Sequence, residues 1–477
     1  MKANLKLSYK THIINPAKAI KHTDLEKSLS VLIGDDKISI DRSDIESHSI
    51  DKWLVGNPPD VVVFAETTDD VVRVIKFAHK NQVPVTTRGA GVGYVGGAVP
   101  MHGGIVLSVA RMKKIKEISP EDGIAVVEPG VITGNLQDAV KEVGYFYPPD
   151  PASLRECSMG GNVATNAGGP RCLKYGVTRH YILGLEVVLA DGSVAKLGGR
   201  CHKNKTGFDL IGMFVGSEGL LGIVTEITCR LIPSPPTRAM LSATFASFAD
   251  AAKTVQNILG SGYLPAALEI ADKFTLSAAR NHVGSEMIPD GEAFLLVELD
   301  GQFESVALEV DALAELIKEN GSLTISVAKD EKGCDDIWEI RRAFSYSLRA
   351  TGLTKLNEDI VVPRGKLVEL VNFCEDLQEE INMPIACFGH AGDGNIHVNV
   401  MVEDIEREEN RVQSDQALNR LFKKVISMNG VVSGEHGIGI AKKKWFNEAL
   451  DSGALNLHQI LKSALDPNSV LNPGKFI

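Results

Sequence analysis

The sequence predicts an α+β protein in which an α/β domain is followed by a smaller domain built on an antiparallel sheet. Strand-like and helix-like apolar patterns alternate regularly from residue 57 to residue 235. Prolines at positions 233, 235 and 236 end this region and mark a domain boundary. After the boundary, short strand patterns alternate with long amphipathic helix patterns, which is typical of helices packed on one face of an antiparallel sheet.

Length and composition limit the class of protein. The 477 residues suffice for two or three domains with their own cores. The net charge of −11 argues against nucleic-acid binding and against docking on anionic lipid through bulk charge. No apolar run approaches the ~18 residues of a transmembrane segment, and no apolar stretch of a signal peptide follows the basic start of the chain. The 7 cysteines contain no C-x-x-C pair, which indicates reduced thiols, a cytoplasmic location and no iron–sulfur cluster in the chain itself.

The glycine-rich stretch at residues 86–97, Thr-Thr-Arg-Gly-Ala-Gly-Val-Gly-Tyr-Val-Gly-Gly, is the first candidate binding site. Glycines let the backbone adopt positive φ, and successive exposed N–H groups then form a nest for phosphate oxygens. The spacing Gly-x-Gly-x-x-Gly resembles a dinucleotide fingerprint, but that fingerprint needs a helix after the last glycine. Here Pro100 and a strand at 105–108 follow instead, so we expect a phosphate cradle between two strands. The alternative is an ordinary glycine-rich hairpin.

The other elements of the first domain follow from local patterns. Thr67 and Asp70 form a capping-box pattern that starts an amphipathic helix. Asp191-Gly192 is a hairpin turn between two strand patterns. We expect mostly helices in residues 1–56, a helix at 135–143, and strands at 61–64, 83–87, 105–108, 124–128, 185–189, 193–197 and 224–232.

Two further glycine-rich runs lie in the same domain. Residues 158–169 mix glycine with small hydrogen-bonding side chains and can approach a flat polar ring system, although on its own this run also fits a turn-rich loop. Residues 216–225 form a third glycine-rich turn that leads into a strand. Such runs, combined in one α/β domain, indicate a large nucleotide-type cofactor.

The second domain carries long helices and a polar hairpin. We expect strands at 240–245, 293–299 and 323–328 and helices at 248–259, 304–319, 333–350, 366–381 and 403–428. Between the last two helices, residues 387–400 predict a strand–turn–strand hairpin. The chain then continues through a Ser-Gly-Glu-His-Gly-Ile-Gly turn at 433–439 and a helix to an Asn-Pro-Gly-Lys tail.

His390 and His397 lie seven residues apart on this hairpin, so their side chains can converge across it although no helical metal-site spacing applies. Glu435 adds a carboxylate from a distant turn. Two imidazoles and one carboxylate with open positions fit a catalytic divalent metal ion. On spacing alone, hydrogen-bonded strand histidines and a surface glutamate are the alternative.

Taken together and in this order, the motifs resemble one family. They are the glycine-rich cradle, the Gly-Gly-Asn-x-Ala-Thr-Asn-Ala-Gly-Gly run, the Gly-His-x-Gly-Asp-Gly-Asn-x-His hairpin, the Ser-Gly-Glu-His-Gly-Ile-Gly turn and the Asn-Pro-Gly-Lys tail. From Pro58 to Ile477 the chain resembles the FAD-dependent D-2-hydroxyacid dehydrogenases, in the branch of D-lactate dehydrogenase, glycolate oxidase catalytic subunit and D-2-hydroxyglutarate dehydrogenase. The resemblance implies a vanillyl-alcohol-oxidase/PCMH-type FAD-binding domain of two α/β subdomains, with an α+β cap domain on an antiparallel sheet.

The resemblance also implies regions and cofactor residues. FAD is expected to bind without a covalent link, because Val92 stands where some relatives carry a tethering histidine. Cys157 is interpreted as a buried packing residue rather than a flavin attachment. The implied regions are an N-terminal helical segment at 1–56, the FAD-binding domain at 57–235, the cap domain at 236–425, and a C-terminal segment at 426–477 that returns to the FAD domain and active site. The implied FAD-binding residues are Arg88, Gly89, Ala90, Gly91, Val92, Gly93, Gly96, Gly97, Pro149, Ser158, Gly160, Gly161, Asn162, Thr165, Asn166, Gly168, Gly169, Glu218, Gly219, Gly222, Ile223, Val224 and Asn472.

Chemical roles follow from the resemblance in the same way. A divalent metal, zinc or manganese, is implied on His390, His397 and Glu435. His436 is the implied base, and its unperturbed pKa near ~6.5 suits it to accept a hydroxyl proton. The resemblance implies that such a metal would hold the carboxylate and hydroxyl of the substrate, and that the Cα hydrogen would pass as hydride to flavin N5.

Substrate contacts are implied for three residues of the second domain. Asn399 matches a substrate-contacting asparagine. Arg341 matches an arginine that holds the substrate carboxylate, with the adjacent Arg342 as the alternative. Lys355 is a further candidate cation, although its spacing to Pro363 departs from that of relatives. Because the longer substrate needs a second cation, D-lactate or glycolate is expected ahead of D-2-hydroxyglutarate.

The reduced flavin needs a redox partner, since the chain has no cluster of its own. An electron-transferring flavoprotein, an iron–sulfur subunit, a cytochrome or a quinone would serve, in a homodimer or hetero-complex that is cytoplasmic or held peripherally at a membrane by its partner. One alternative is a non-catalytic FAD subunit that relays electrons, which the presence of His390, His397, Glu435 and His436 disfavours. Another is a sugar or aromatic-alcohol oxidase on the same fold, which the metal motif and the missing cradle histidine disfavour.

Overall fold

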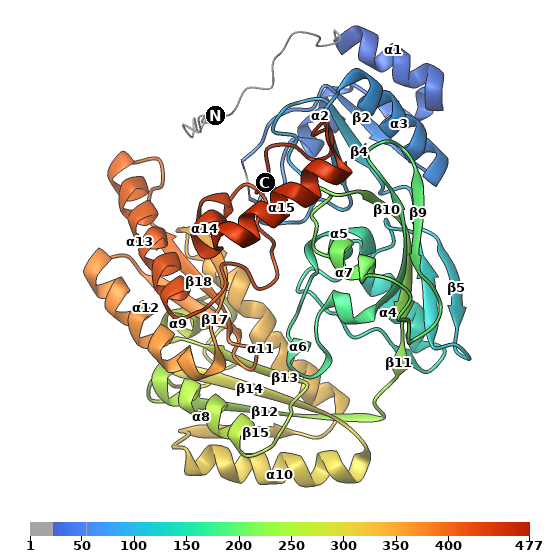
Figure 1. The fold of residues 1–477 in the computed structure, drawn as a ribbon. Helices are drawn as coiled ribbons and strands as arrows, with labels where there is room; N and C mark the ends of the chain where they lie inside the picture. Colours follow the sequence, from blue (N-terminus) through green and yellow to red (C-terminus); the bar gives the residue numbers. More distant parts are fainter. Residues whose placement is uncertain (1–21, 54) are drawn as a thin grey trace. The chain divides into compact units, whose positions relative to one another are not determined.

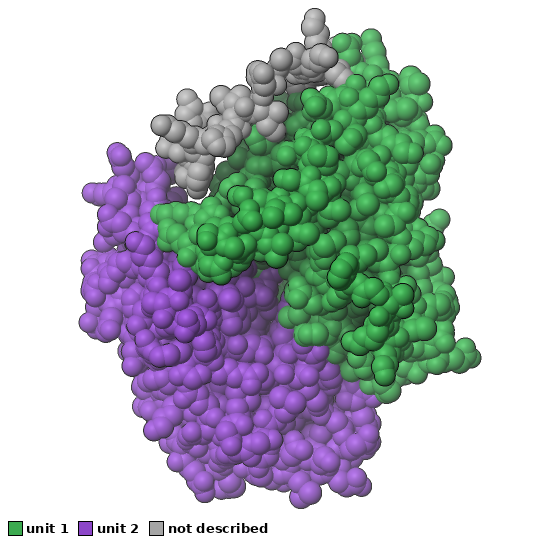
Figure 2. All heavy atoms as spheres, viewed as in Figure 1, with its two compact units in different colours: residues 1–167, 177–233, 436–477 green, residues 168–176, 234–435 purple. Residues whose placement is uncertain are grey.

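The computed structural model describes residues 22–53 and 55–477, which form two compact units (Figures 1 and 2). Unit 1 lies within residues 1–167, 177–233 and 436–477, and unit 2 within residues 168–176 and 234–435; Figure 2 colours them green and purple. The chain therefore leaves unit 1 and returns to it, and its last return falls at the peptide bond after Glu435. Residues 1–21 of the predicted N-terminal segment lie outside the described residues.

A four-stranded sheet in unit 1 leads into the first glycine-rich stretch. Its order is β1-β2-β4-β3, with β2, β4 and β3 parallel and β1 antiparallel. Thr67 caps the neighbouring helix through the predicted capping box with Asp70, so that prediction is confirmed. The elements are β1 (Ile38–Ser39), β2 (Val61–Phe64), β3 (Val85–Arg88) and β4 (Ile105–Ser108), with η1 (Asp35–Lys37) and helices α1 (His22–Ile33), α2 (Arg42–His48) and α3 (Thr68–Asn81).

A five-stranded antiparallel sheet forms the rest of the framework of unit 1. Its order is β5-β6-β10-β8-β9, and the predicted Asp191-Gly192 turn joins β8 to β9. A two-stranded sheet pairs β11 with β7. The strands are β5 (Ile115–Ser119), β6 (Ile124–Val127), β7 (Tyr145–Phe146), β8 (Ile182–Val188), β9 (Val194–Gly198), β10 (Ile223–Arg230) and β11 (Ile232–Pro233), and the helices are α4 (Thr133–Lys141), α5 (Met159–Thr165), η2 (Thr178–Tyr181), α7 (Leu210–Phe214), α14 (Lys443–Ala449) and α15 (Ser452–Leu465).

The two long glycine-rich runs differ in local structure. No helix opens after Gly96, as predicted, and β4 is the next element. The second run forms the short helix α5, which the sequence analysis did not assign. Ser158 caps it because its Oγ accepts a hydrogen bond from Gly161 N, and Asn166 ends it in the left-handed region at φ 52°.

Unit 2 is organised around one seven-stranded antiparallel sheet, which confirms the predicted sheet type. Its order is β15-β12-β14-β13-β17-β18-β16. The strands are β12 (Thr237–Phe245), β13 (Ala267–Ala271), β14 (Ala293–Gly301), β15 (Thr324–Ala328), β16 (Thr354–Val361), β17 (Ile385–His390) and β18 (Asn395–Val402), and the helices are α6 (Cys172–Tyr175), α8 (Phe248–Gly260), α9 (Lys273–Val283), α10 (Phe303–Glu319), α11 (Glu331–Ala350), η3 (Arg364–Lys366), α12 (Leu367–Ile381) and α13 (Glu408–Ser427). The sequence analysis missed β13, α9 and β16.

Helices α9 and α11 cover one face of this sheet. Leu276 of α9 and Phe344 of α11 share a core cluster with Phe294, Phe388 and Met401 from three strands. These side chains exclude water from one side of β14, β17 and β18, so polar groups on that face lie in a dry environment. Among the described helices, none is long and apolar enough to cross a membrane.

Candidate functional site

The hairpin of β17 and β18 brings two predicted histidines together. Its register pairs Phe388 with His397 and His390 with Asn395. Because directly opposite residues of an antiparallel pair share a face, both imidazoles emerge on the face covered by α11. Their ring centroids lie 5.4 Å apart in an edge-to-face arrangement. The turn requires Gly394, which has φ 77° and whose Cβ would meet Val362 O at 2.1 Å.

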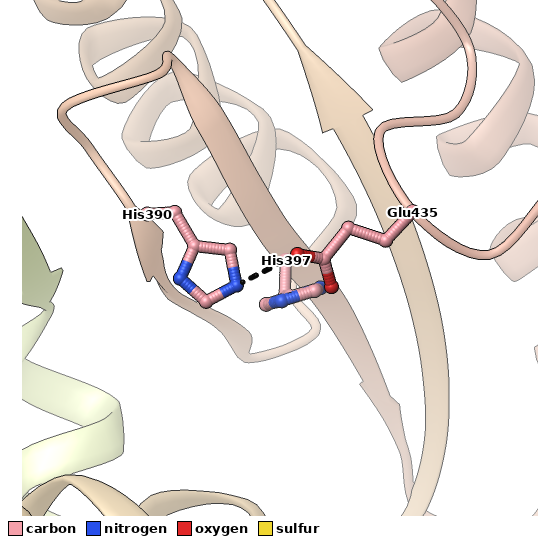
Figure 3. Close-up of side chains that lie close together, drawn as sticks. All are labelled: His390, His397 and Glu435. Atoms are coloured by element: carbon pink, nitrogen blue, oxygen red, sulfur yellow. Dashed lines mark ion pairs between the residues drawn. The ribbon is translucent and has the colours of Figure 1, made fainter. Parts of the chain in front are cut away.

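Glu435 completes a three-residue cluster with these histidines (Figure 3). Its Oε1 lies 3.2 Å from His390 Nε2, and one donor atom from each of the three residues falls within 4.8 Å of the others. Among the described residues this is the one group of three or more His, Cys, Asp or Glu side chains close enough to share a metal ion. Two nitrogen donors and one carboxylate oxygen fit a divalent transition metal with open positions. We call His390, His397 and Glu435 the ligand cluster.

Glu269, which the sequence analysis missed, supports the ligand cluster from β13. The register places it directly opposite His390, and its side chain has no exposed surface. Its Oε1 lies 2.6 Å from His390 Nδ1, and its Oε2 accepts a 2.6 Å hydrogen bond from Arg341 Nε. When Nδ1–H donates to a carboxylate, the second ring nitrogen of the imidazole remains available for a metal.

The charges around His390 are strongly coupled. Burial lowers the pKa of His390, but the carboxylates of Glu269 and Glu435 outweigh it and raise the pKa well above its ordinary value. Burial likewise raises the pKa of Glu269, but His390 and Arg341 outweigh it and lower the pKa to about 2. Two carboxylates therefore surround a position that favours positive charge, as a cation site requires.

The structure separates the two neighbouring arginines. Arg341 points inward, with a 12% exposed side chain, whereas Arg342 is 54% exposed and pairs with Glu339 on the surface. The guanidinium of Arg341 lies over the ring of Phe388, with Cζ 4.8 Å from the centroid. Lys355 Nζ lies 5.4 Å from the same centroid. The sequence left open which arginine faces inward, and packing answers that question.

Lys355 is a partly buried cation with one side-chain hydrogen bond to a neutral group. Its Nζ donates to Ser345 Oγ at 3.2 Å. Burial, reinforced by Arg349 and Arg341, lowers the pKa of Lys355 to about 7. A lysine whose pKa is lowered by burial favours an anionic partner, because a nearby anion would stabilise its charged form.

Two more side chains on this face are firmly held. Asp359 on β16 accepts hydrogen bonds from Gly434 N at 2.9 Å and Glu435 N at 2.8 Å through one oxygen, and from Asn395 Nδ2 at 2.7 Å through the other. It thereby positions the turn that carries the third member of the ligand cluster, and the sequence analysis missed it. Asn399 donates to the carbonyls of Ala386 and His397, and its buried Oδ1 has no protein partner.

In unit 1, the first two glycine-rich runs meet. Ser158 Oγ accepts hydrogen bonds from Ala90 N at 3.3 Å and Gly161 N at 3.4 Å. Both runs line a cavity of about 240 Å³ together with Lys113, Gly130 and their neighbours. This volume suits one part of a dinucleotide. The guanidinium of Arg88 instead donates to the carbonyls of Ser47 and Ile50, so this predicted cofactor residue holds the segment between β1 and β2 in place.

Unpartnered polar atoms provide a test of whether the remaining segments fit a cofactor. Asn472 Nδ2 donates to Gly97 O at 3.0 Å and Glu218 O at 2.8 Å, which joins the cradle, the third glycine-rich turn and the C-terminal tail. The buried Asn472 Oδ1 and Thr87 Oγ1 have no protein partner. Gly219 lies beside both residues, because a Cβ built on it would be 3.9 Å from Asn472 Nδ2 and 3.9 Å from Thr87 Cβ. Buried polar atoms normally have partners, so these segments fit a large polar cofactor.

The predicted base lies beside the cradle. The ring of His436 stacks on that of Tyr94, with centroids 5.0 Å apart and an interplanar angle of 27°.

Cys157 is buried and its Sγ donates to Thr133 Oγ1, which agrees with a packing role. Asn162 is also turned inward, because its Nδ2 donates to the same Thr133 hydroxyl. All 7 cysteines are free.

Comparison with known proteins shows the family of the chain. The chain matches a family of FAD linked oxidases, C-terminal domain, over residues 234–476 and an FAD binding domain family over residues 59–198. It is 38% identical to the glycolate oxidase subunit GlcD of Bacillus subtilis (strain 168), covering 88% of this chain and 89% of the relative. It is 34% identical to the D-lactate dehydrogenase of Anaerostipes hadrus over the same shares of the two chains.

Solved structures agree on the fold. A structure of p-cresol methylhydroxylase with substrate bound aligns with a TM-score of 0.80 at 20% identity, covering 95% of this chain and 96% of that one. A 4-ethylphenol oxidase from Gulosibacter chungangensis gives 0.78 at 20% identity, covering 97% and 98%. The fold is therefore a vanillyl-alcohol-oxidase/PCMH-type FAD-binding domain with an α+β cap, as predicted. With these matches, the chain belongs to the FAD-linked oxidase family and is an FAD-dependent oxidoreductase.

Proposed function

We propose that this enzyme oxidises a small D-2-hydroxyacid, D-lactate or glycolate, to the 2-oxoacid. The observation that carries the proposal is the shared carboxylate of Glu269, which binds His390 of the ligand cluster and Arg341 at the same time. A metal-binding histidine and a carboxylate-binding arginine are thereby held next to each other, and a 2-hydroxyacid presents a hydroxyl and a carboxylate on adjacent carbons. The names of the relatives, a glycolate oxidase subunit and a D-lactate dehydrogenase, support this substrate class.

The ligand cluster would hold a divalent ion, zinc or manganese. Its two imidazole nitrogens and one carboxylate oxygen are a donor set that such ions accept, and Glu269 and Asp359 orient two of the donors. The chemistry that the ion supplies is Lewis-acid stabilisation of negative charge on the substrate oxygen.

Arg341 and Asn399 would bind the substrate itself. Arg341 gives its Nε to Glu269, which fixes the plane of the guanidinium and leaves its terminal nitrogens for a carboxylate. The unpartnered Oδ1 of Asn399 can accept a hydrogen bond from a donor group of the substrate. Both groups lie in a dry, preorganised environment, where such bonds are strong.

His436 would act as the base. It takes the hydroxyl proton, while the electron pair of the Cα–H bond leaves with the hydrogen as hydride and the C=O bond forms. Its stacking on Tyr94 holds the imidazole plane, so that a ring nitrogen is presented in a fixed direction. The chemistry that FAD supplies when bound is acceptance of that hydride at flavin N5. The residues proposed to hold FAD are those of the three glycine-rich runs and Asn472.

Reoxidation of the flavin would need a partner, because the 7 cysteines do not have the spacing of an iron–sulfur cluster site. One relative is by name a subunit of a larger oxidase, which supports a hetero-complex with a redox protein. An electron-transferring flavoprotein, an iron–sulfur subunit, a cytochrome or a quinone each fits this role.

A second candidate substrate, D-2-hydroxyglutarate, is favoured by one observation. Lys355 and Arg341 both lie over the ring of Phe388, so the second cation that a distal carboxylate requires is present on the same face. Steady-state assays on D-lactate, L-lactate, glycolate and D-2-hydroxyglutarate with an artificial dye acceptor decide between the two. A specificity constant for D-2-hydroxyglutarate far above that for D-lactate would reverse the order proposed above.

The proposed base is tested by His436→Asn in anaerobic stopped-flow measurements of flavin bleaching. Loss of a general base typically slows the step by ~10²–10⁴, and we expect a drop of that size with FAD and metal content unchanged. The matched control is His282→Asn on the exposed end of α9, which should reduce flavin at the parent rate. A parent-like rate for His436→Asn would assign proton transfer to another residue. Loss of metal from the variant would instead make His436 a candidate ligand.

A further inference from the structure

The turn at residues 433–439 is held from two sides by buried carboxylates. Asp359 of unit 2 binds the backbone N–H groups of Gly434 and Glu435, and Glu218 of unit 1 binds those of Ile438 and Gly439. The two carboxylates bind different residues of the turn, and the chain passes from unit 2 to unit 1 between these two pairs of residues. The half of the turn that carries His436 therefore has its own support.

Glu218 binds the turn through both of its carboxylate oxygens, in a buried position. Its Oε1 accepts from Ile438 N at 2.7 Å, and its Oε2 accepts from Gly439 N at 2.8 Å. The residue is 8% exposed, although 220 positions separate it from the turn in sequence. Charge-assisted hydrogen bonds of this length in a water-poor environment are among the strong ones.

Glu218 is itself rigidly placed. Its backbone has φ 50°, its N–H donates to Ala164 O at 2.8 Å, and its carbonyl accepts from Asn472 Nδ2 at 2.8 Å. A non-glycine residue in the left-handed region persists only where its surroundings impose it. Burial raises the pKa of Glu218 to about 7, and the two N–H groups and nearby lysines oppose that rise.

The turn leaves no room for adjustment around this carboxylate. Gly437 has φ 85°, and a Cβ there would lie 2.7 Å from Glu218 Oε1. The residue before it, His436, stacks on Tyr94. An aromatic ring thus holds the face of the imidazole, and the carboxylate of Glu218 holds the backbone two and three residues further along the turn.

We propose that Glu218 is a positioning residue that fixes the turn after His436 and so directs the imidazole at the substrate. The proposal rests on the proposed role of His436 as the base. Glu218 acts through His436 and not through the ligand cluster, whose turn is anchored by Asp359. A misplacement of about 1 Å at a reacting group can cost ~10²-fold in rate, so loss of this anchor should have a kinetic signature.

The test is a double-mutant cycle of Glu218→Gln and His436→Asn, measured by anaerobic flavin reduction at saturating substrate and pH 8.5. Glutamine keeps one acceptor but turns an NH2 group toward the other backbone N–H, which breaks one of the two bonds. We expect Glu218→Gln to slow reduction ~10–100-fold with metal content unchanged, and to have no further effect in the His436→Asn background. Glu226→Gln on β10, a 30% exposed carboxylate paired with Lys116, is the matched control and should reduce flavin at the parent rate.

Amide hydrogen exchange of the peptide that spans residues 436–441 gives a second readout in the loaded enzyme. We expect faster exchange in Glu218→Gln and parent-like exchange in the control variant Glu226→Gln. If Glu218→Gln fails to fold or loses FAD, Gly437→Ala disturbs the same turn from the other side and should slow reduction and speed exchange in the same way.

The outcomes separate this proposal from the proposed function. Equal slowing by Glu218→Gln in both backgrounds, or a parent-like rate and exchange, overturns the positioning role and leaves His436 as the base. A parent-like rate for His436→Asn alone overturns the base assignment, and the role of Glu218 falls with it.

Discussion

Glu269→Gln probes the link between the ligand cluster and Arg341, the arginine that we propose to bind substrate. The carboxylate has no exposed surface and divides its two oxygens between His390 Nδ1 and Arg341 Nε, each at 2.6 Å. Glutamine offers one acceptor oxygen, so one of the two donors must face an NH2 group instead. The substitution is isosteric, and its effects therefore report on charge and hydrogen bonding rather than on volume.

Two magnitudes follow from this geometry. Loss of the partner that orients a ligating histidine typically weakens metal binding 10–100-fold, or about 1.4–2.7 kcal/mol. Removal of the counter-charge from Arg341, whose side chain is 12% exposed, leaves an unpaired guanidinium, which costs about 3–5 kcal/mol of folding stability. We expect both effects in one variant.

The assay is zinc titration of metal-free protein by calorimetry, with thermal unfolding of the same samples. Glu298→Gln is the matched control, because Glu298 is a 1% exposed carboxylate on the adjacent strand β14 that binds Arg171 and touches no histidine. It should lower stability to a similar extent and leave zinc affinity at the parent value. Parent-like zinc affinity in Glu269→Gln, or equal weakening in both variants, would refute the orienting role of Glu269.

Three further predictions concern the cofactor, the metal and the partly buried Lys355. Acid or heat precipitation should release all the yellow colour, because Val92 offers no group for a covalent link; flavin that stays with the precipitated chain would contradict this. Prolonged chelation should abolish turnover while the FAD spectrum stays nearly intact, and zinc or manganese should restore it, whereas full turnover in protein shown to be metal-free by elemental analysis would rule out a catalytic metal. Burial lowers the pKa of Lys355 from 10.5 to about 7. Between these two pH values the unfolded chain binds a proton at Lys355 that the folded protein does not bind, so the stability of the parent should rise with pH in this range. Lys355→Met should therefore raise the free energy of unfolding at pH 7 by about 2–5 kcal/mol and flatten that slope in denaturant titrations, and parallel slopes in parent and variant would contradict it.

Local sequence patterns correctly predicted the elements that depend only on residues close together in the chain. The capping box of Thr67 and Asp70, the Asp191-Gly192 hairpin and the long amphipathic helices all form as expected. Each depends on residues within a few positions of one another, so the pattern alone contains the cause. The missed strand β13 is five residues long and wholly buried, and a short buried run has no period to distinguish it from a helix segment.

The sequence of β13 contains a feature that the sequence analysis did not use. Glu269 interrupts the apolar run Ala-Leu-Glu-Ile-Ala, and an ionisable residue in such a run is seldom buried without a partner. The sequence could thus have marked Glu269 as a candidate for a functional pair. It could not have named the partners, since His390 lies 121 positions away and Arg341 72 positions away.

Motif chemistry in the sequence was enough to identify the family and the FAD cofactor and to single out His390, His397 and Glu435, which the structure brings together, because each motif carries its residue types and order in one short stretch. Strand register and helix packing, which are absent from any single stretch, were needed to turn Arg341 rather than Arg342 inward and to place Glu269 opposite His390. The same is true of Asp359 and Glu218, which hold two halves of one turn from distant parts of the chain. The physical reason is that a buried carboxylate must be satisfied by whichever donors the fold brings to it, and those donors are chosen by the pairing of strands far apart in sequence.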